Sequence, residues 1–153
     1  MPDGLYETDS LNWAEQQSTL LRRLSRGERV NDAIDWPHVI EEIHDVGLSE
    51  LHACESLLAQ AVLHLLKIKA WPSGPVRHWS SEVLVFLADA QRRFSPSMRQ
   101  RIALGRIYAK ACRAVRVSEF DGVPAATLPD ACPYALDDLL ADEPDLARLI
   151  GPA

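Results

Sequence analysis

The sequence predicts an all-α fold: a four-helix bundle-like single domain with a long second helix and a short C-terminal helical lid. Apolar residues recur at steps of three and four along most of the chain, which is the period of one helix face. Short segments with proline, glycine or serine separate these stretches, and no segment indicates a pair of strands. We expect the domain to cover residues 6–142, with residues 1–5 and 143–153 as flexible or peripheral termini.

The first and third helices have clear start signals. The first begins near Asp9 or Ser10, which can cap it, and Gly27 is placed to end it. The third enters at Pro75, a residue that the first turn of a helix tolerates. Its predicted buried face consists of Val76, Trp79, Val83, Phe86, Leu87 and Ala90.

The second helix is predicted to be unusually long. It starts at residues 35–37, and its apolar series keeps one phase to Ile68. Two separate helices would have no reason to stay in phase across Gly47, so we favour one helix that ends before residue 71 and can kink at Gly47. The alternative is a break at Gly47, with Ser49 capping a new helix. The predicted stripe includes Ile40 and Ile43.

A fourth helix is predicted to begin at Ser95-Pro96, with serine as the cap and proline in the first turn. After Asp121-Gly122 the pattern loosens, and a short helix over residues 134–141 is predicted to pack as a lid. The fourth helix has a broad apolar surface formed by Met98, Ile102, Leu104, Ile107, Tyr108, Ala111, Cys112 and Val115.

Composition predicts a cytoplasmic protein that binds no membrane. The 153 residues are 47% hydrophobic and 25% charged, which is ordinary for a globular domain. No run approaches the ~20 apolar residues of a membrane span, and the N-terminus lacks a signal pattern. The net charge of −6 argues against general affinity for nucleic acid. Cys54, Cys112 and Cys132 show no paired spacing and are expected to be reduced packing residues.

Charge is segregated along the chain. Residues 35–55 hold six acids without Lys or Arg, and residues 96–118 hold six bases without an acid. Four of these bases share one face of the predicted fourth helix: Arg99, Arg106, Lys110 and Arg113. We expect this basic stripe to pair with acids of residues 35–55 or of the C-terminal tail, or with an external anionic partner.

Acids and histidines of the second helix do not predict a metal centre. His38, Glu41, Asp45 and His52 fall on one face, almost opposite the apolar stripe. A group on that face points into water, whereas a metal site needs three or four converging ligands. We therefore predict no metal, no cofactor and no catalytic residue here.

One small pocket is predicted between helices. If the second and third helices are antiparallel neighbours, equal rise from the turn at Pro72 brings His64 level with Trp79. The same counting brings Tyr108 of the fourth helix within a turn of this layer. A pocket lined by a histidine, an indole and a phenol is expected there.

The same register places Glu50 level with Arg93 and next to Arg92. Glu50 lies on the flank of the apolar stripe, so we expect a partly buried carboxylate that needs a cation. The sequence predicts a Glu50–Arg92 or Glu50–Arg93 pair that joins the second and third helices.

The order and spacing of several short motifs resemble a known family. The motifs are Tyr6-x-x-Asp9-x-x-x-Trp13, Asp35-Trp36, Glu41-Glu42-Ile43, Gly47-x-Ser49-Glu50, His64-Leu65-Leu66-Lys67, Trp79, Ser95-Pro96-Ser97, Tyr108-Ala109 and Pro129-x-x-Cys132-Pro133-Tyr134. Together they are similar to the bacterial family called domain of unknown function twenty-nine, over residues 6–140. The resemblance implies an all-helical bundle and no named activity. The connector before Asp35 and the acidic tail after Asp142 depart from the family pattern.

Three classes of function remain open. The favoured class is a non-enzymatic helical module that binds another protein or itself. The second is an enzyme or metal-dependent hydrolase with a site between helices, around Glu50, His64, Trp79 and Tyr108. The third is an acidic-tailed nucleic-acid regulator that uses the basic stripe. The sequence names no substrate, partner or oligomeric state.

Overall fold

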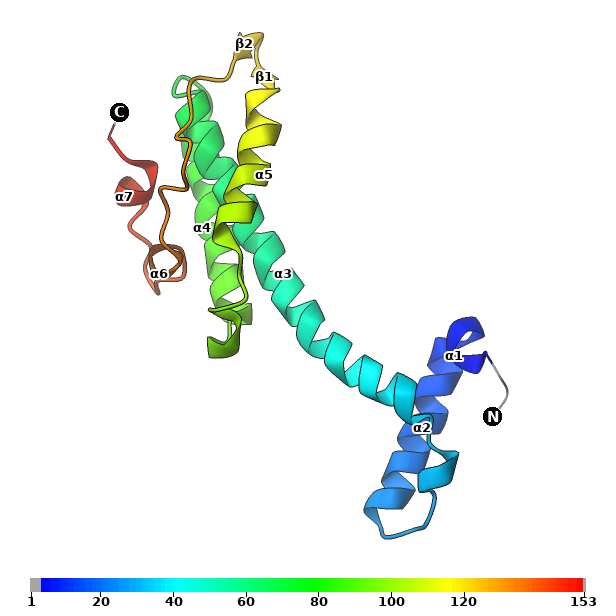
Figure 1. The fold of residues 1–153 in the computed structure, drawn as a ribbon. Coiled ribbons are helices and arrows are strands. Elements are labelled where there is room, and N and C mark those ends of the chain that lie inside the picture. Colours follow the sequence, from blue (N-terminus) through cyan, green and yellow to red (C-terminus); the bar gives the residue numbers. More distant parts are fainter. Residues whose placement is uncertain (1–3, 153) are drawn as a thin grey trace. The chain divides into compact units, whose positions relative to one another are not determined.

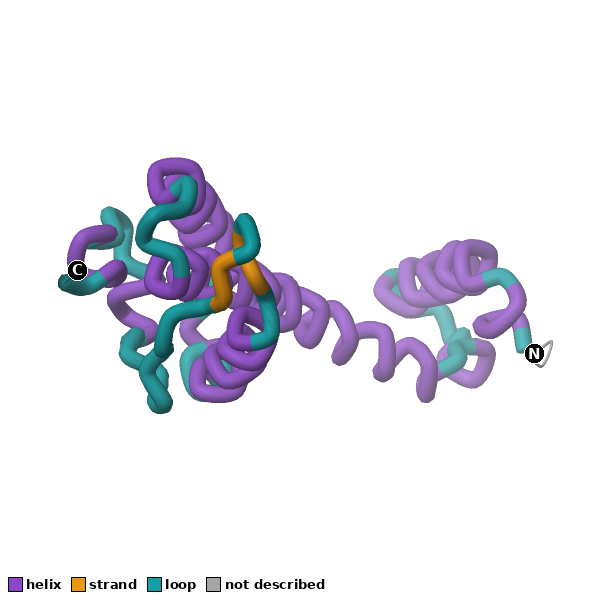
Figure 2. The backbone as a smooth tube through the Cα atoms, turned by 90° about the horizontal axis from the view of Figure 1, so that it is seen from above, coloured by secondary structure: helices purple, strands orange, loops and turns teal. Residues whose placement is uncertain are grey.

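The computed structural model describes residues 4–152 and confirms the all-α class. Figure 1 shows that helices are the main elements, and Figure 2 shows strands in one small hairpin. The α-helices are α1 (Leu5–Thr8), α2 (Ser10–Ser25), α3 (Trp36–Ala70), α4 (Val76–Arg93), α5 (Leu104–Arg116), α6 (Leu136–Leu139) and α7 (Leu146–Ile150). Two 3-10 turns, η1 (Asn31–Ala33) and η2 (Pro96–Met98), and two strands, β1 (Glu119–Phe120) and β2 (Val123–Pro124), complete the set.

The chain forms two compact units, the first ending at Leu48 and the second beginning at Ser49. This boundary falls inside α3, so one helix contributes to both units. Each unit has a hydrophobic core of its own. The single domain expected over residues 6–142 stays a prediction.

The first unit is built from α1, α2, η1 and the start of α3. Its buried apolar residues are Trp13, Ile34 and Val39. The side chain of Asp9 accepts a hydrogen bond from the Asn12 backbone N–H at 3.0 Å, which caps α2 as predicted. The short helix α1 was not predicted from the sequence.

Helix α3 is continuous through Gly47, so the predicted long helix is confirmed and the break is excluded. From Leu51 to Ile68 the apolar stripe is buried, as its period indicates. The N-terminal part of the stripe differs from the prediction, because Ile40 and Ile43 are 62% and 69% exposed. Periodicity identifies an apolar face, but it does not supply a neighbour to cover that face.

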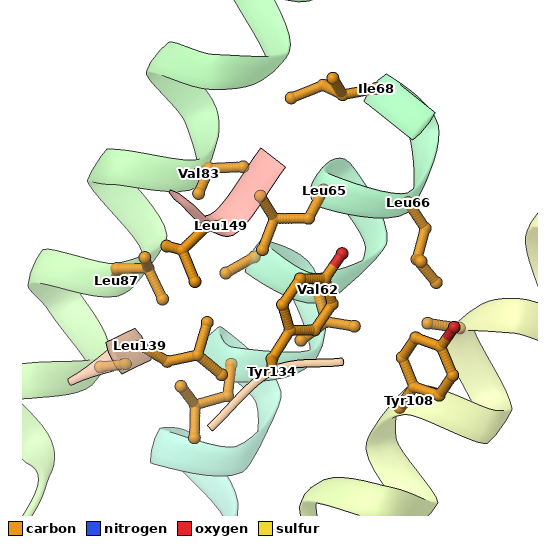
Figure 3. Close-up of a cluster of buried hydrophobic side chains, with 14 of the residues drawn as sticks. Val62, Leu65, Leu66, Ile68, Val83, Leu87, Tyr108, Tyr134, Leu139 and Leu149 are labelled. Carbon is orange, nitrogen blue, oxygen red and sulfur yellow. The ribbon is translucent and has the colours of Figure 1, made fainter. Parts of the chain in front are cut away.

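The core of the second unit lies among α3, α4, α5 and the C-terminal segment. Figure 3 shows Leu65 of α3 on the side of Val83 and Leu87 of α4, and Leu66 on the side of Tyr108 of α5. The α4 prediction is confirmed, since Trp79, Val83, Leu87 and Ala90 are buried.

The fourth long helix begins at Leu104 and not at Ser95-Pro96, which corrects the prediction. Residues 96–98 form the 3-10 turn η2, and the Ser95 side chain caps no backbone N–H there. Met98 and Ile102 are both buried, so packing holds this segment in a turn. Arg99 therefore precedes α5 instead of lying on it.

The C-terminal segment packs on the core more fully than predicted. Leu139 of α6 is fully buried, in keeping with the predicted lid. Helix α7 falls in residues expected to be flexible or peripheral, yet Leu149 is 5% exposed and lies in the core (Figure 3). Lys69 Nζ also donates a hydrogen bond to the Ile150 carbonyl at 2.9 Å. Residues 146–150 are thus part of the folded unit.

A β-hairpin of two short antiparallel strands follows α5, although no strand pair was predicted. Its turn consists of Asp121 and Gly122, with φ angles of 50° and 75°, the left-handed conformation that tight hairpin turns require. The indole N–H of Trp71 donates to the Val123 carbonyl at 2.8 Å, which attaches the hairpin to the end of α3. Within residues 4–152, no helix has both the length and the apolarity needed to cross a membrane.

Candidate functional site

Helices α3 and α5 line a groove of about 480 Å³ on the surface of the second unit. Both walls are regular helices, so the residues that face the groove recur at helical spacing. From α3 come His52, Glu55, Ser56, Ala59, Gln60 and Leu63; from α5 come Arg106, Ile107, Lys110, Ala111 and Ala114.

The floor of the groove is apolar and mostly made of small side chains. Ile107, Ala111 and Ala114 follow one face of α5, opposite Ala59 and Leu63 of α3. Small residues on a helix face let another backbone approach closely. The floor therefore has the character of a surface on which an element can pack.

The α5 rim of the groove is cationic. Arg106 and Lys110 are exposed, as is Arg113 one turn further on. These three bases take part in no ion pair within the described part of the chain. The α3 rim bears Glu55 and His52.

The structure divides the predicted basic stripe. Arg99, in the turn before α5, pairs with Asp137 of α6 and lies over the Phe94 ring at 5.5 Å. Arg99 thus pairs within the chain, with an acid that precedes the acidic tail after Asp142. The other three stripe residues remain available for an external anionic group.

The structure does not bring the three residues of the predicted pocket together. His64 Nδ1 lies 2.7 Å from the Gln60 carbonyl, and its ring lies 5.4 Å from that of Phe86. Trp79 packs instead on Trp71 and Phe120, with ring centroids at 6.3 and 5.2 Å.

Tyr108 belongs to a third set of contacts, in which its hydroxyl donates to the Pro129 carbonyl. Its ring lies 6.1 Å from that of Tyr134. The contact of His64 with Phe86 lies about two turns along α4 from Trp79, so the predicted layer of three residues does not form.

Glu50 contacts Arg93 of α4, with Arg93 Nη1 and Glu50 Oε2 at 3.4 Å. Arg92 pairs instead with Asp89 on its own helix. The side chains of Glu50 and Arg93 are 52% and 50% exposed. The partly buried carboxylate that the sequence suggested is therefore a largely solvated one.

In the first unit a polar network surrounds Asp35. One carboxylate oxygen, Oδ2, lies 2.9 Å from Trp13 Nε1 and 2.7 Å from His38 Nδ1. The Tyr6 ring stacks on His38 at 4.0 Å, and its hydroxyl donates to Glu42 Oε1 at 2.5 Å. These contacts tie α1 and α2 to the start of α3.

The network shifts three pKa values. The hydrogen bond to Glu42 raises the pKa of Tyr6 to about 12. The hydrogen bond to Asp35 raises the pKa of His38, although desolvation opposes it. Burial acts to raise the pKa of Asp35, but the hydrogen bonds from His38 and Trp13 together lower it.

Sequence reasoning placed His38 on a solvated face with Glu41, Asp45 and His52, and so missed this network. The available signal was the spacing of Asp35 and His38, three residues apart at a helix start. His38 Nε2 lies 3.8 Å from Glu7, so both ring nitrogens face internal acids. No group of three or more His, Cys, Asp or Glu within residues 4–152 is arranged to hold a metal ion.

The cysteines lie where small packing residues are expected. Cys54 and Cys112 are buried and Cys132 is half-buried, all three as free thiols. Burial raises the pKa of Cys54 and of Cys132, which keeps these thiols protonated and unreactive at neutral pH.

The fold and the groove define an all-α helical protein with an apolar, basic-rimmed surface groove. The family model for the domain of unknown function DUF29 matches residues 5–143, and the chain belongs to this family. The chain is also similar to the crystal structure of an α-helical protein of unknown function from Rhodospirillum rubrum. The two share 32% sequence identity and a TM-score of 0.71, over 95% of this chain and 94% of that one. A search of curated proteins found no match.

Proposed function

We propose that this protein is a non-enzymatic interaction module whose α3–α5 groove binds an amphipathic helix of a protein partner. The observation that supports the proposal is the groove itself, with an apolar floor and, on its α5 rim, cations that form no ion pair among residues 4–152. Helix-in-groove recognition uses this combination, because apolar anchors fill the floor and rim charges set the orientation.

The rim determines the chemistry of the partner. Arg106, Lys110 and Arg113 attract acidic side chains, so the bound helix bears Asp or Glu beside its apolar face. A duplex or single-stranded nucleic acid would use the cations but not the apolar floor. The net charge of −6 also disfavours a polyanion, so a protein helix fits the groove better.

Site-specific crosslinking in the producing cell tests the proposal. A photoreactive amino acid replaces Ala114, an exposed groove residue. The matched control replaces Ala88, an exposed alanine on α4 that does not line the groove. We expect a discrete crosslinked protein adduct from position 114 and none from position 88.

The charge of the rim supplies a second readout. Arg106→Glu combined with Lys110→Glu reverses the rim without touching the core, since both side chains are exposed. The adduct at position 114 should then disappear, because acids of the partner would meet acids of the rim. Equal adducts at positions 114 and 88, or an adduct that survives charge reversal, would contradict a helix-binding groove.

A further inference from the structure

We propose that the groove binds a second copy of this chain, through an apolar stripe at the start of α3. The stripe consists of Trp36, Ile40, Ile43 and Val46. In this contact the stripe of one copy lies in the α3–α5 groove of another. The inference rests on the proposed function, since it names the partner of the same groove.

The stripe is an unusually large apolar surface for a single helix face. Ile40, Ile43 and Val46 are 62%, 69% and 67% exposed, and Trp36 is 40% exposed. They recur at steps of four, three and three, the spacing of anchors on an amphipathic helix. The core of the first unit uses Val39 instead, so none of the described residues of this unit covers the stripe. An exposed apolar patch of this kind marks an interaction site.

The charges beside the stripe exclude pairing with an identical stripe. Glu42 lies beside the stripe, and residues 35–55 contain six acids with no Lys or Arg. Two such stripes in contact would place acid against acid, which is unfavourable. The complementary surface must be apolar with a basic rim.

The chain itself has that complementary surface in the α3–α5 groove. Arg106, Lys110 and Arg113 line or extend its α5 rim without ion pairs to any residue from 4 to 152, and α5 contains no acid. Acids beside the stripe would meet these bases while the isoleucines pack on the small residues of the floor.

The length of the stripe also agrees with the length of the groove. From Trp36 to Val46 the stripe extends about 15 Å at the rise of an α-helix, and the groove wall from His52 to Leu63 extends about 16 Å. The stripe and one wall of the groove belong to the same continuous helix, α3. The stripe of one copy therefore matches the groove of another copy in length.

Sedimentation equilibrium of the purified full chain tests the inference. We expect reversible self-association at concentrations up to about 500 μM, as for weak specific contacts. Added salt should weaken it by screening the rim. Ile43→Asp in the stripe, and Arg106→Glu with Lys110→Glu in the groove, should each weaken association at least about tenfold.

Two matched controls separate the contact from general surface effects. Val85→Asp changes an apolar residue of α4 that is 56% exposed, and Arg77→Glu reverses an exposed charge on the same helix. Both should leave association unchanged. Circular dichroism melts verify that every variant is folded.

Mixing the two defective variants is the decisive measurement. The stripe variant retains an intact groove and the groove variant retains an intact stripe, so one contact forms between them. Calorimetric titration should detect binding in the mixture at concentrations where neither variant self-associates. A monomeric wild type, a stripe variant that associates normally, or a mixture that does not bind would overturn the inference.

These outcomes are distinguishable from failure of the proposed function. If the purified chain stays monomeric while position 114 crosslinks a different protein in cells, the groove binds a helix but the partner is not this chain. If position 114 yields no adduct at all and the variants do not associate, both proposals fail.

Discussion

At Gly74 the backbone lies against the indole of Trp79. A Cβ there would stand 2.7 and 2.8 Å from two ring atoms of Trp79 and 3.1 Å from the Trp71 carbonyl oxygen. The ring packs in the core and cannot swing away, so Gly74→Ala should cost about 1–3 kcal/mol of unfolding free energy. Denaturant titration measures this loss. Gly105→Ala is the matched control, because its Cβ meets nothing within 4 Å, and it should stabilise α5 by about 0.5–1 kcal/mol.

The Asp35–His38 contact makes the stability of the first unit depend on pH. His38 has a pKa raised above 6.5, so its contribution is full below that value and is lost as pH rises through the raised pKa. Asp35 has a pKa lowered below 3.8, so its contribution is present above that value and is lost as pH falls through the lowered pKa. The contact therefore stabilises the first unit most at pH values between the lowered pKa of Asp35 and the raised pKa of His38.

Asp35→Asn tests this contact. It should return the pKa of His38 toward 6.5, because the hydrogen bond that His38 donates to Asp35 is the largest cause of the shift. NMR titration of the imidazole protons measures that pKa. Wild-type stability should fall as pH rises above about 6.5 and through the raised pKa of His38, and the variant should lose most of this dependence. An unchanged His38 titration in the variant would refute the role of Asp35.

The Glu50–Arg93 pair should contribute little to the free energy of unfolding. Its side chains are about half exposed and its atoms are 3.4 Å apart, so Glu50→Ala should cost less than about 1 kcal/mol. A double-mutant cycle with Arg93→Ala isolates the pair from other effects of each substitution. A coupling energy above about 2 kcal/mol would show that water screens the pair less than its exposure indicates.

Sequence reasoning at the residue level succeeded where regular geometry governed the contact. Glu50 and Arg93 meet because both lie in the middle of helices whose rise is known. His38 was misplaced because its partners Tyr6 and Trp13 come from separate helices. Their approach depends on the packing of the first unit, which no helical period encodes.

Among the elements, α7 offers a direct test of the corrected C-terminal boundary. Leu149 is 5% exposed and packs in the core of the second unit. Leu149→Ala should therefore cost about 2–4 kcal/mol, the range of a buried leucine truncation. Val117→Ala removes methyl groups from a side chain that is 85% exposed, and it should change stability by less than about 0.5 kcal/mol. Thermal denaturation followed by circular dichroism compares the two, and similar melts would place α7 outside the core.

Element boundaries were predictable only where local signals agreed with packing. Asp9 caps α2, and the phase of α3 holds through Gly47. The start of α5 was misjudged because Ser95-Pro96 has the chemistry of a helix start, yet burial of Met98 and Ile102 holds a turn there. Tertiary packing overrode a correct local preference.

For the whole molecule, periodicity was enough to predict the all-α class but not the division into two units. Ile40 and Ile43 continue the stripe of α3 without a change of phase, although nothing in the first unit covers them. A hydrophobic period is the same for a covered and an uncovered face. The groove was missed for a related reason, since its walls come from two helices whose separation the sequence does not specify.

The distribution of the tryptophans gives each unit an optical reporter of its own. Trp13 and Trp36 belong to the first unit, and Trp71 and Trp79 to the second. The first core has only three buried apolar residues among those described, so the emission of Trp13 should shift to longer wavelength at a lower denaturant concentration than that of Trp71. Variants in which phenylalanine replaces all tryptophans except Trp13, or all except Trp71, separate the two emission spectra. Coincident transitions would instead mean that α3 transmits unfolding between the two cores, as in a single cooperative domain.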